Sequence, residues 1–451
     1  MGEFDQHQST RQIHDLSEAI STGQLQPVKR LVNSLSAAEI GGLLESLPPS
    51  RRMIVWKLVD SDYGGEVLVH VNDEVRGGLI DVMENHELVA ATGNLQLDDL
   101  ADILDDLPDT VIRQVLHSMD HDDRERLSQV LAYPEDSAGG LMSPDVVTVR
   151  ANVTLDVVSR YLRQRGHLPE LTDYLYVVNR TGQYLGRLAI TDLLTKEPRC
   201  QVSDLIDASV SGIPLDLSAN EVALKFEHHD WVSAPVVDAN NRLVGRITID
   251  DVVDVIRDEA EHSVMSMAGL DEETDMFAPV ARSVRRRMIW LSFNLIAALL
   301  AAWAISQFEG TIQQVVALAA LMPIVASMGG IAGSQTLTLM IRGMALGQIG
   351  GRNSWPLLSR ELAVGFINGL TLSIIVGGLA AAWFDQLDIG LVIGSALVIN
   401  LLVGALAGVL IPLILNRLDI DPALAGGVVL ISITDVVGFV TFLGLGTIYL
   451  L

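Results

Sequence analysis

A single aspartate lies inside the last long apolar stretch of the sequence. Asp435 is the only charged residue in 422–451, and it follows Pro422 by thirteen residues. At ~1.5 Å per residue along a helix, this places it about 20 Å from the helix start, near the middle of a bilayer. An ionisable side chain at that depth is costly and is typical of a functional site. The apolar stretches contain no lysine or histidine, so the expected partner is a cation. The alternative is a protonated, hydrogen-bonded aspartate at a helix contact.

The residue types that are absent near Asp435 limit which cations this region could bind. All ten histidines lie at or before His262, and Cys200 is the only cysteine. Zinc and copper usually recruit imidazole or thiolate ligands, whereas Mg²⁺ prefers oxygen ligands and keeps its waters. The H-E-x-x-H string of an intramembrane metalloprotease is absent. The sequence therefore favours a hard cation and argues against an enzyme.

A second group of polar side chains lies just before the apolar half and is strongly acidic. Its members recur mostly at helical spacing: Asp250, Asp251, Asp254, Asp258, Glu259, Glu261 and His262. Like charges four residues apart on a helix cost roughly 0.2–0.5 kcal/mol per pair. One interpretation is a solvated helix surface. The other is a surface whose carboxylates are bridged by divalent cations.

Small residues interrupt the second long apolar stretch. Gly329, Gly330 and Gly333 are followed by Ser334 and Gln335. Small residues permit close helix approach, and backbone carbonyls at such places can line a cavity. The sequence leaves two interpretations open, namely pore lining by the glycines and Ser334, and simple tight packing.

The elements that must hold these residues follow from the distribution of charge. The net charge of −26 belongs wholly to residues 1–284, because residues 285–451 contain seven arginines, no lysine and seven acidic residues. Five apolar stretches in the second part reach the ~20 residues needed to span a bilayer. We expect a membrane domain over 285–451 with spans at about 288–308, 313–341, 362–384, 389–416 and 422–450.

The arginines indicate how the spans are oriented. All seven lie before the first span, between the second and third, or between the fourth and fifth. Basic residues that flank short loops stay on the cytosolic side. We therefore expect a cytosolic N-terminal part and a periplasmic or extracellular C-terminus. The N-terminus is polar and lacks an apolar signal region, so nothing suggests that the acidic half is exported.

One internal repeat occupies the second half of the acidic part. The stretch from Tyr176 aligns without gaps with the stretch from Pro235 at an offset of 59 residues, and each copy predicts a strand, a turn, a second strand and a helix start. The copies resemble a tandem pair of CBS domains, over 140–200 and 201–262. Such pairs are regulatory α/β modules.

The CBS resemblance implies one candidate nucleotide site. In many nucleotide-binding pairs a threonine and an aspartate three residues later hold ribose and phosphate, and Thr248 and Asp251 match that pattern. The first copy has Ala189 at the threonine position. ATP or another adenine nucleotide at this single site and an empty structural cleft both remain open.

A second repeat lies upstream of the CBS pair. The segments that begin at Ala37 and Leu97 align at an offset of 60 residues, and each ends at a proline. Apolar residues at i, i+3, i+4 and i+7 predict short amphipathic helices. We therefore expect an all-α superhelical domain over 10–132.

The joint order of these parts resembles the MgtE magnesium transporters over essentially the whole chain. The strings that carry the resemblance are LDDLADIL from Leu97, SAGGLMSP from Ser137, ITIDDVVDVI from Ile247, GGIAGSQTLTL from Gly329, and DPALAGG followed by ITDVVGF in the last span. The resemblance implies a homodimer in the bacterial inner membrane, with Asp435 at the pore ion. Asp421, in DPALAGG, is a further candidate for pore lining.

The resemblance also implies how the pore closes. The segment 250–284 corresponds to an acidic plug helix and linker, and Mg²⁺ bound between this helix, the CBS pair and the helical domain holds the pore shut. The residues that match family gating ligands are Asp98, Asp102, Asp251, Asp254 and Glu259.

The chain departs from the family pattern at several positions. The pore asparagines of the family are replaced by Ile331 and Ser334, and Gly427 stands where another asparagine often occurs. His262 and Ser263 stand where the family usually has gating acids. These departures from the family pattern concern the residues from which ion selectivity and the placement of gating ions would be expected, and they leave Asp435 as the main polar ligand of the pore.

Together these observations predict a multi-domain protein with a superhelical N domain, tandem CBS domains and a five-span α-helical membrane domain. The predicted function is a Mg²⁺ channel or transporter that cytosolic Mg²⁺ closes. Its expected partners are lipid, Mg²⁺ and a second copy of the chain, without nucleic acid. Two alternatives are a less selective transporter of Co²⁺, Mn²⁺ or Ca²⁺, and a non-conducting CBS-based sensor of Mg²⁺ or nucleotide.

Overall fold

The structure of the protein is a computed structural model. It describes residues 25–60, 63–93, 95–104, 106–270, 274–349, 354–418 and 420–451. The first fifteen residues of the predicted 10–132 domain, and 271–273 of the predicted linker, lie outside this description. Contacts divide the chain into an acidic unit, residues 1–260 with 273–278, and a membrane unit, residues 261–272 with 279–451.

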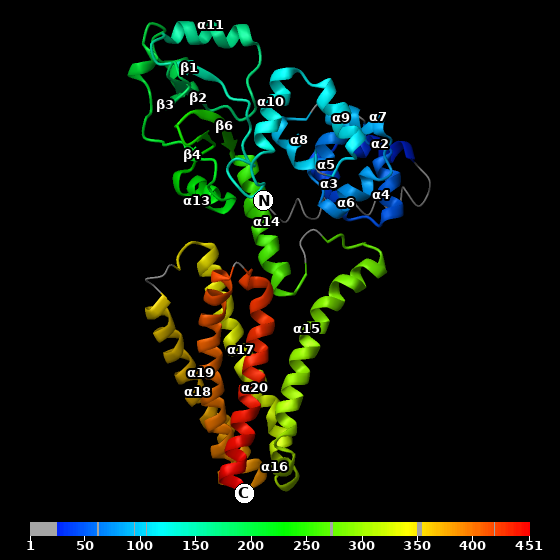
Figure 1. The fold of residues 1–451 in the computed structure, drawn as a ribbon, viewed down its shortest axis with the longest axis vertical. Coiled ribbons are helices and arrows are strands. Elements are labelled where there is room, and N and C mark those ends of the chain that lie inside the picture. The colour runs from blue at the N-terminus through cyan, green and yellow to red at the C-terminus, as the bar shows by residue number, and fades with distance from the viewer. Residues whose placement is uncertain are drawn as a thin grey trace. The chain divides into compact units, whose positions relative to one another are not determined.

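Short helices build the N-terminal part of the acidic unit (Figure 1). They are α2 (Leu25–Val32), α3 (Ala37–Glu45), α4 (Pro49–Trp56), α5 (Gly64–Val69), α6 (Asp73–Ile80), α7 (Asn85–Thr92), α8 (Leu97–Leu104), α9 (Asp109–Ser118) and α10 (His121–Val130). Helix starts follow local capping chemistry. Ser36 and Glu39 form a capping box at α3, and the Asn72 side chain caps α6. The predicted 60-residue repeat corresponds to α3 and α8.

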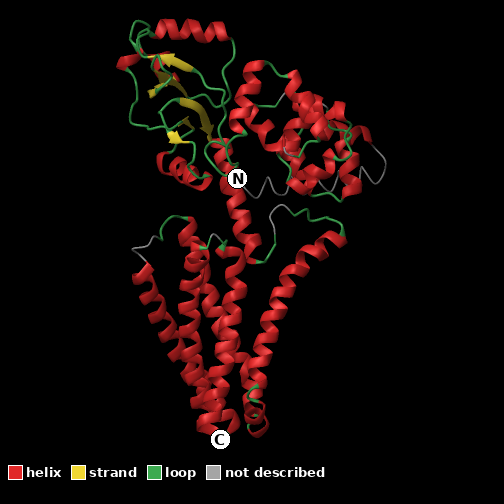
Figure 2. Cartoon of the chain, viewed as in Figure 1, coloured by secondary structure: helices red, strands yellow, loops and turns green. Residues whose placement is uncertain are grey.

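Two small sheets form the second part of the acidic unit, and Figure 2 shows that strands occur only there among the described residues. The first sheet has the order β1 (Thr148–Arg150), β2 (Tyr174–Val178), β3 (Tyr184–Ala189), and the second has β4 (Ile213–Pro214), β5 (Ser233–Val237), β6 (Leu243–Thr248). In each sheet the first two strands are parallel and the last two antiparallel. The strands β2 and β5 start 59 residues apart, as do β3 and β6, so the predicted CBS repeat is confirmed.

Helices accompany each sheet in a way that repeats the same plan. The first repeat contains α11 (Leu155–Arg165) and α12 (Ile190–Thr195), and the second contains α13 (Ala219–His229) and the start of α14 (Ile249–Met267). The helix α14 starts directly after β6 with two acids in its first turn, where the helix dipole favours negative charge. Its residues up to 260 belong to the acidic unit, and the rest belong to the membrane unit.

Among the described residues, five helices are long and apolar enough to cross a membrane. They are α15 (Val280–Ser306), α17 (Ala317–Ala345), α18 (Ser354–Phe384), α19 (Leu387–Arg417) and α20 (Pro422–Leu450), with the short α16 (Glu309–Gln314) after the first. The α15 helix starts eight residues before its predicted span because it continues through the three arginines 285–287. Long basic side chains can extend from a helix end toward water while the helix continues.

The helix α19 lies between α18 on one side and α17 with α20 on the other, and packs against all three (Figure 1). Glycines bring α17 and α19 into backbone contact. A Cβ atom added at Gly404 would lie 2.7 Å from the carbonyl oxygen of Gly329, and one added at Gly408 would lie 2.8 Å from that of Gly333. This glycine seam fixes which face of α17 is packed and which is free.

Candidate metal sites

The free face of α17 lines a cavity of about 700 Å³ together with α20. Its lining comprises Ala326, Ser327, Gly330, Ile331, Ser334, Gln335, Thr338, Ile431 and Asp435. The carboxylate of Asp435 supplies the charge of this lining, and hydroxyl and amide groups from α17 supply further oxygen atoms. Oxygen donors around one carboxylate suit a hard, hydrated cation such as Mg²⁺.

The structure separates the small residues that the sequence grouped together. Gly330 and Ser334 line the cavity, whereas Gly329 and Gly333 lie buried in the glycine seam. A Cβ atom at Gly329 would clash with the Asn400 amide at 2.1 Å. The structure thus divides the two interpretations left open by the sequence: Gly329 and Gly333, four residues apart, share the packed helix face, whereas Gly330 faces the cavity.

Asp421 lies at the N-cap of α20 and not in the lining of the cavity. Its carboxylate accepts hydrogen bonds from the backbone N–H groups of Ala423 at 2.8 Å and Leu424 at 3.2 Å. Its Oδ2 also lies 3.2 Å from Nε2 of His262, on the last turns of α14. The α14 helix thereby contacts the start of the helix that carries Asp435. His262 makes this contact directly, at a position where the family resemblance led us to expect an acid.

A second candidate site lies in the acidic unit, where helix α8 and the start of α14 each contribute carboxylates. We call Asp98, Asp99, Asp102, Asp250, Asp251 and Asp254 the acidic cluster. Burial, together with the neighbouring carboxylates, raises the pKa of Asp251 to about 8 and that of Asp99 to about 7. Carboxylates that are crowded without enough counter-charge resist ionisation.

Three further members of the cluster respond in the same direction. Burial raises the pKa of Asp102 to about 6, although its side chain is more exposed, and it also raises the pKa of Asp98 and Asp254. The Oδ1 atom of Asp98 is buried and has no hydrogen-bond partner. An unpartnered buried acceptor is costly. The cluster is therefore suited to a cation that would supply the missing partner.

The remaining gating candidate, Glu259, lies outside this cluster. Glu259 is two turns further along α14 than Asp251 and accepts a hydrogen bond from Asn220 at 2.8 Å. In the described part of the chain, no three acidic, histidine or cysteine side chains already converge as a ready-made metal cage. The cluster supplies charge, and its side chains would need to rearrange to bind an ion directly.

The candidate nucleotide residues are adjacent to the acidic cluster. The Thr248 hydroxyl donates to Oδ2 of Asp251 at 3.1 Å, so the two side chains meet as the sequence pattern predicts. Asp251 is thus shared between the nucleotide pattern and the acidic cluster. In the first repeat, the equivalent position is Ala189 at the end of β3, which offers no hydroxyl group.

Two polar residues inside the membrane unit were missed at the sequence level. Glu361 in α18 is 7% exposed and accepts a hydrogen bond from the Thr336 hydroxyl at 3.1 Å. Asn400 in α19 is fully buried and donates to the carbonyl oxygen of Val325 at 2.8 Å. Glu361 follows Arg360 at the edge of an apolar run, so the sequence placed it outside the span. Asn400 could have been identified from the sequence, because an amide side chain inside an apolar span needs a hydrogen-bond partner.

Family models match the helical N-terminal part, both CBS repeats and most of the membrane part of the chain. The family model described as a divalent cation transporter (MgtE) matches residues 322–445, that of the MgtE intracellular N domain matches 35–136, and that of the CBS domain matches 138–198 and 202–258.

Curated relatives match along almost their whole length. The magnesium transporter MgtE of Thermus thermophilus is 30% identical over 441 residues, which cover 96% of this chain and 98% of the relative. That of Bacillus subtilis is 27% identical over 428 residues, or 95% of each chain. Among solved structures, the cytosolic domain of the Mg²⁺ channel MgtE in complex with ATP is 31% identical, covers 54% of this chain and 99% of that chain, and gives a TM-score of 0.49.

Proposed function

Because this chain belongs to the MgtE family of magnesium transporters, we propose that it conducts Mg²⁺ past Asp435 and that cytosolic Mg²⁺ closes this path. The observation that carries the proposal is the cavity between α17 and α20, whose lining combines oxygen-bearing side chains with the carboxylate of Asp435. A carboxylate at this place can attract a divalent cation without removing its waters. The same lining offers no imidazole or thiolate group.

The acidic cluster supports the closing mechanism. At neutral pH Asp99 and Asp251 are only partly ionised, because their ionisation is opposed by burial and by repulsion from neighbouring carboxylates. A divalent cation that binds them replaces protons and favours the arrangement in which α8 lies against α14. A ligand shifts a conformational equilibrium toward the state that it binds better. When Mg²⁺ falls, repulsion returns and α14 is released.

We propose that the protein works as a homodimer with its acidic unit in the cytosol. The arginines that flank the spans support this orientation under the positive-inside rule. A cavity with one carboxylate per chain is also consistent with a pore whose second wall comes from another copy. Purification in mild detergent followed by mass measurement tests the dimer, and labelling of engineered cysteines from either side of the membrane tests the orientation.

The conducting role is tested by growth rescue of a bacterial strain that depends on external Mg²⁺. The unaltered chain should restore growth at low Mg²⁺, and Asp435→Ala should not. The matched control is Asp388→Asn, which removes an exposed carboxylate at the start of α19. If the unaltered chain gives no rescue while it reaches the membrane, a non-conducting sensor explains the protein better. Competition with Co²⁺, Mn²⁺ and Ca²⁺ in the same assay separates a selective from a broad transporter.

The closing role is tested by limited proteolysis of the full-length protein. We expect millimolar Mg²⁺ to slow digestion of the acidic unit, because the ion holds α8 against α14. Equal digestion rates with and without Mg²⁺ would refute the gating proposal.

The Thr248–Asp251 pair supports an adenine nucleotide as a second ligand of the CBS pair. A hydroxyl group and a carboxylate at this spacing can bind a ribose and its phosphate. Because Asp251 also belongs to the acidic cluster, nucleotide and Mg²⁺ should affect each other's affinity. Titration calorimetry with ATP on the unaltered chain and on Thr248→Ala tests this, with Thr195→Ala as a control at an exposed threonine.

A further inference from the structure

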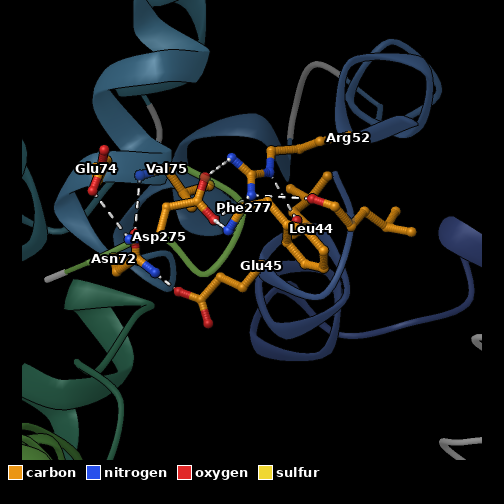
Figure 3. A network of polar contacts seen from close by, with 9 residues as sticks. Leu44, Glu45, Arg52, Asn72, Glu74, Val75, Asp275 and Phe277 are labelled. Carbon is orange, nitrogen blue, oxygen red and sulfur yellow. Dashed lines mark hydrogen bonds and ion pairs between the residues drawn. The ribbon is translucent and has the colours of Figure 1, made fainter. Parts of the chain in front are cut away.

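The segment between α14 and the first membrane helix returns to the helical N-terminal domain. Residues 274–278 belong to the acidic unit, whereas Pro279, the next residue, belongs to the membrane unit and caps α15. Figure 3 shows Asp275 of this segment pointing at Arg52 on α4. The two residues are 223 positions apart in the sequence.

The contact between Asp275 and Arg52 is a bidentate ion pair. Nη1 of Arg52 donates to Oδ2 of Asp275 at 2.8 Å, and Nη2 donates to Oδ1 at 2.9 Å. The two side chains are only 6% and 5% exposed. Two parallel charged hydrogen bonds fix both distance and orientation. A pair this well buried defines one docking position for the segment.

The surroundings of the pair satisfy its remaining groups. Nε of Arg52 donates to the carbonyl oxygen of Leu44 at 2.9 Å, and Nη2 donates to that of Leu47 at 3.1 Å. On the linker side, the Phe277 N–H donates to Oδ1 of Asp275 at 2.9 Å. A buried ion pair is stable only when such further hydrogen bonds compensate for lost hydration. The N-terminal domain therefore contains a preformed binding site for the Asp275 carboxylate.

The linker backbone is held as well. The Asp275 N–H donates to Oε2 of Glu74 in α6 at 3.1 Å, and the Ala278 N–H donates to the carbonyl oxygen of Asp275 at 3.0 Å (Figure 3 shows the first of these). In contrast, the neighbouring Met276 side chain is 83% exposed. The docking thus depends on Asp275 and on backbone groups, and not on burial of the linker's apolar side chains.

From these contacts we propose that residues 274–278 form a docked strap that ties the helical N-terminal domain directly to the start of the first membrane helix. The strap gives this domain a second connection to the membrane unit, beside the route through the CBS pair and α14, in which the ion pair and hydrogen bonds hold the chain segment that continues into α15. Any displacement of the N-terminal domain would pull on Pro279 and α15. This inference extends the proposed gating and rests on it for its functional consequence.

The docking itself is tested by hydrogen exchange on the full-length protein, independently of conduction. Peptides that cover 274–278 should be protected in the unaltered chain, and Asp275→Asn should speed their exchange at least about tenfold, because amide protection requires the hydrogen bonds that the pair holds. The matched control is Met276→Gln in the same strap, which should leave exchange unchanged. Equal exchange in Asp275→Asn and the unaltered chain would overturn the docking.

The functional consequence is tested by the Mg²⁺ concentration that halves ion flux in vesicles. The strap stabilises the arrangement in which the N-terminal domain is held, so Asp275→Asn should raise this concentration several-fold, and Met276→Gln should not. Exchange that increases without any change in this concentration would overturn the coupling. If the unaltered chain is not closed by Mg²⁺, the proposed function fails, and the exchange comparison still decides whether the strap is docked.

The double variant Arg52→Met with Asp275→Leu separates folding from docking. It replaces the buried pair by apolar side chains, which often restores stability. The N-terminal domain should then stay folded, as judged by its unfolding temperature, while the linker amides still exchange faster than in the unaltered chain. Full protection in this folded double variant would overturn the role of the ion pair.

Discussion

Two regions of the acidic unit neutralise buried or half-buried carboxylates in opposite ways. Asp275 meets Arg52 in a complete network of hydrogen bonds, so its charge is balanced by the protein itself. Asp99 and Asp251 in the acidic cluster face mainly other carboxylates, and their pKa values rise to about 7 and about 8. The first arrangement is complete without an ion. The second lacks such a counter-charge, so its carboxylates resist ionisation unless protons or cations supply it.

The membrane unit provides the sharpest test of this distinction, because Asp435 also faces a cavity without a basic partner in its lining. We expect Asp435→Asn to reduce Mg²⁺ uptake to the level of cells without the protein, since a neutral amide attracts a divalent cation far less. Flux into vesicles measures this. The level of protein in the membrane serves as the control. Uptake that survives the substitution would mean that the cavity is not the ion path.

Within the acidic unit, the largest expected effect belongs to the paired carboxylate. Arg52→Ala leaves the Asp275 charge buried and unpaired, so the free energy of unfolding should fall by about 3–5 kcal/mol. Chemical unfolding of the full-length protein in detergent, followed by tryptophan fluorescence, measures this loss. Mg²⁺ should not restore it. A stability equal to that of the unaltered protein would show that the pair is not buried in solution.

Removal of a carboxylate from the acidic cluster should instead increase the free energy of unfolding. Asp99→Asn removes one of several repelling charges, and one unit of pKa shift corresponds to about 1.4 kcal/mol, so the Mg²⁺-free form should become more stable by on the order of 2 kcal/mol. The unfolding temperature without Mg²⁺ should rise, and the further rise caused by Mg²⁺ should shrink. Asp81→Asn, at the C-cap of α6, is a control outside the cluster. A destabilised Asp99→Asn protein would contradict the comparison.

The same raised pKa values fix a pH dependence. A carboxyl group whose pKa is raised in the folded state stabilises that state fully below its ordinary pKa of 3.8, and this contribution is lost as pH rises through the folded value. With values of about 6, 7 and 8 for Asp102, Asp99 and Asp251, the Mg²⁺-free unfolding temperature should fall between pH 5 and pH 8. Saturating Mg²⁺ should flatten the profile. A flat profile without Mg²⁺ would show that the cluster is hydrated and ionised throughout.

The smallest expected effect concerns the contact between α14 and α20. His262→Ala removes a partly exposed hydrogen bond to Asp421, which is worth about 0.5–1.5 kcal/mol. The Mg²⁺ concentration that halves flux should therefore shift a few-fold. Glu261→Gln changes the neighbouring exposed residue and serves as the control. If Glu261→Gln shifted this Mg²⁺ concentration more than His262→Ala, the contact between His262 and Asp421 would not be the one that matters for closing.

The sequence was sufficient where a pattern is local or repeats. The superhelical domain, the CBS pair and the five membrane helices are confirmed, because hydrophobic periodicity, repeat offsets and apolar length each report one element. Local sequence patterns failed where the prediction depends on which side of a helix a residue occupies. Helix α17 is apolar on almost all sides, so the sequence alone did not show that Gly330 would face a cavity and that Gly329 would face Asn400.

Contacts between distant positions were also out of reach. Nothing near Arg52 distinguishes it from Arg51, and nothing near Asp275 marks it among the other acids of the linker. Their pairing depends on how the chain returns to α4 after α14. The same holds for His262 and Asp421, which are 159 positions apart. The residues that match family gating ligands remain predictions in their roles, although Asp98, Asp102, Asp251 and Asp254 meet in one cluster.

The glycine seam between α17 and α19 has a mechanical consequence. Where backbones touch, as at Gly404 against Gly329, there is no side-chain layer that can be compressed or rearranged. Packed protein interfaces move between discrete arrangements and do not stretch. The wall of the cavity formed by α17 is therefore a stiff plate that moves as one body with α19. Widening of the ion path would therefore have to come from elements other than α17 and α19. Gly404→Ala, whose Cβ would meet the Gly329 carbonyl oxygen at 2.7 Å, should push α17 and α19 apart.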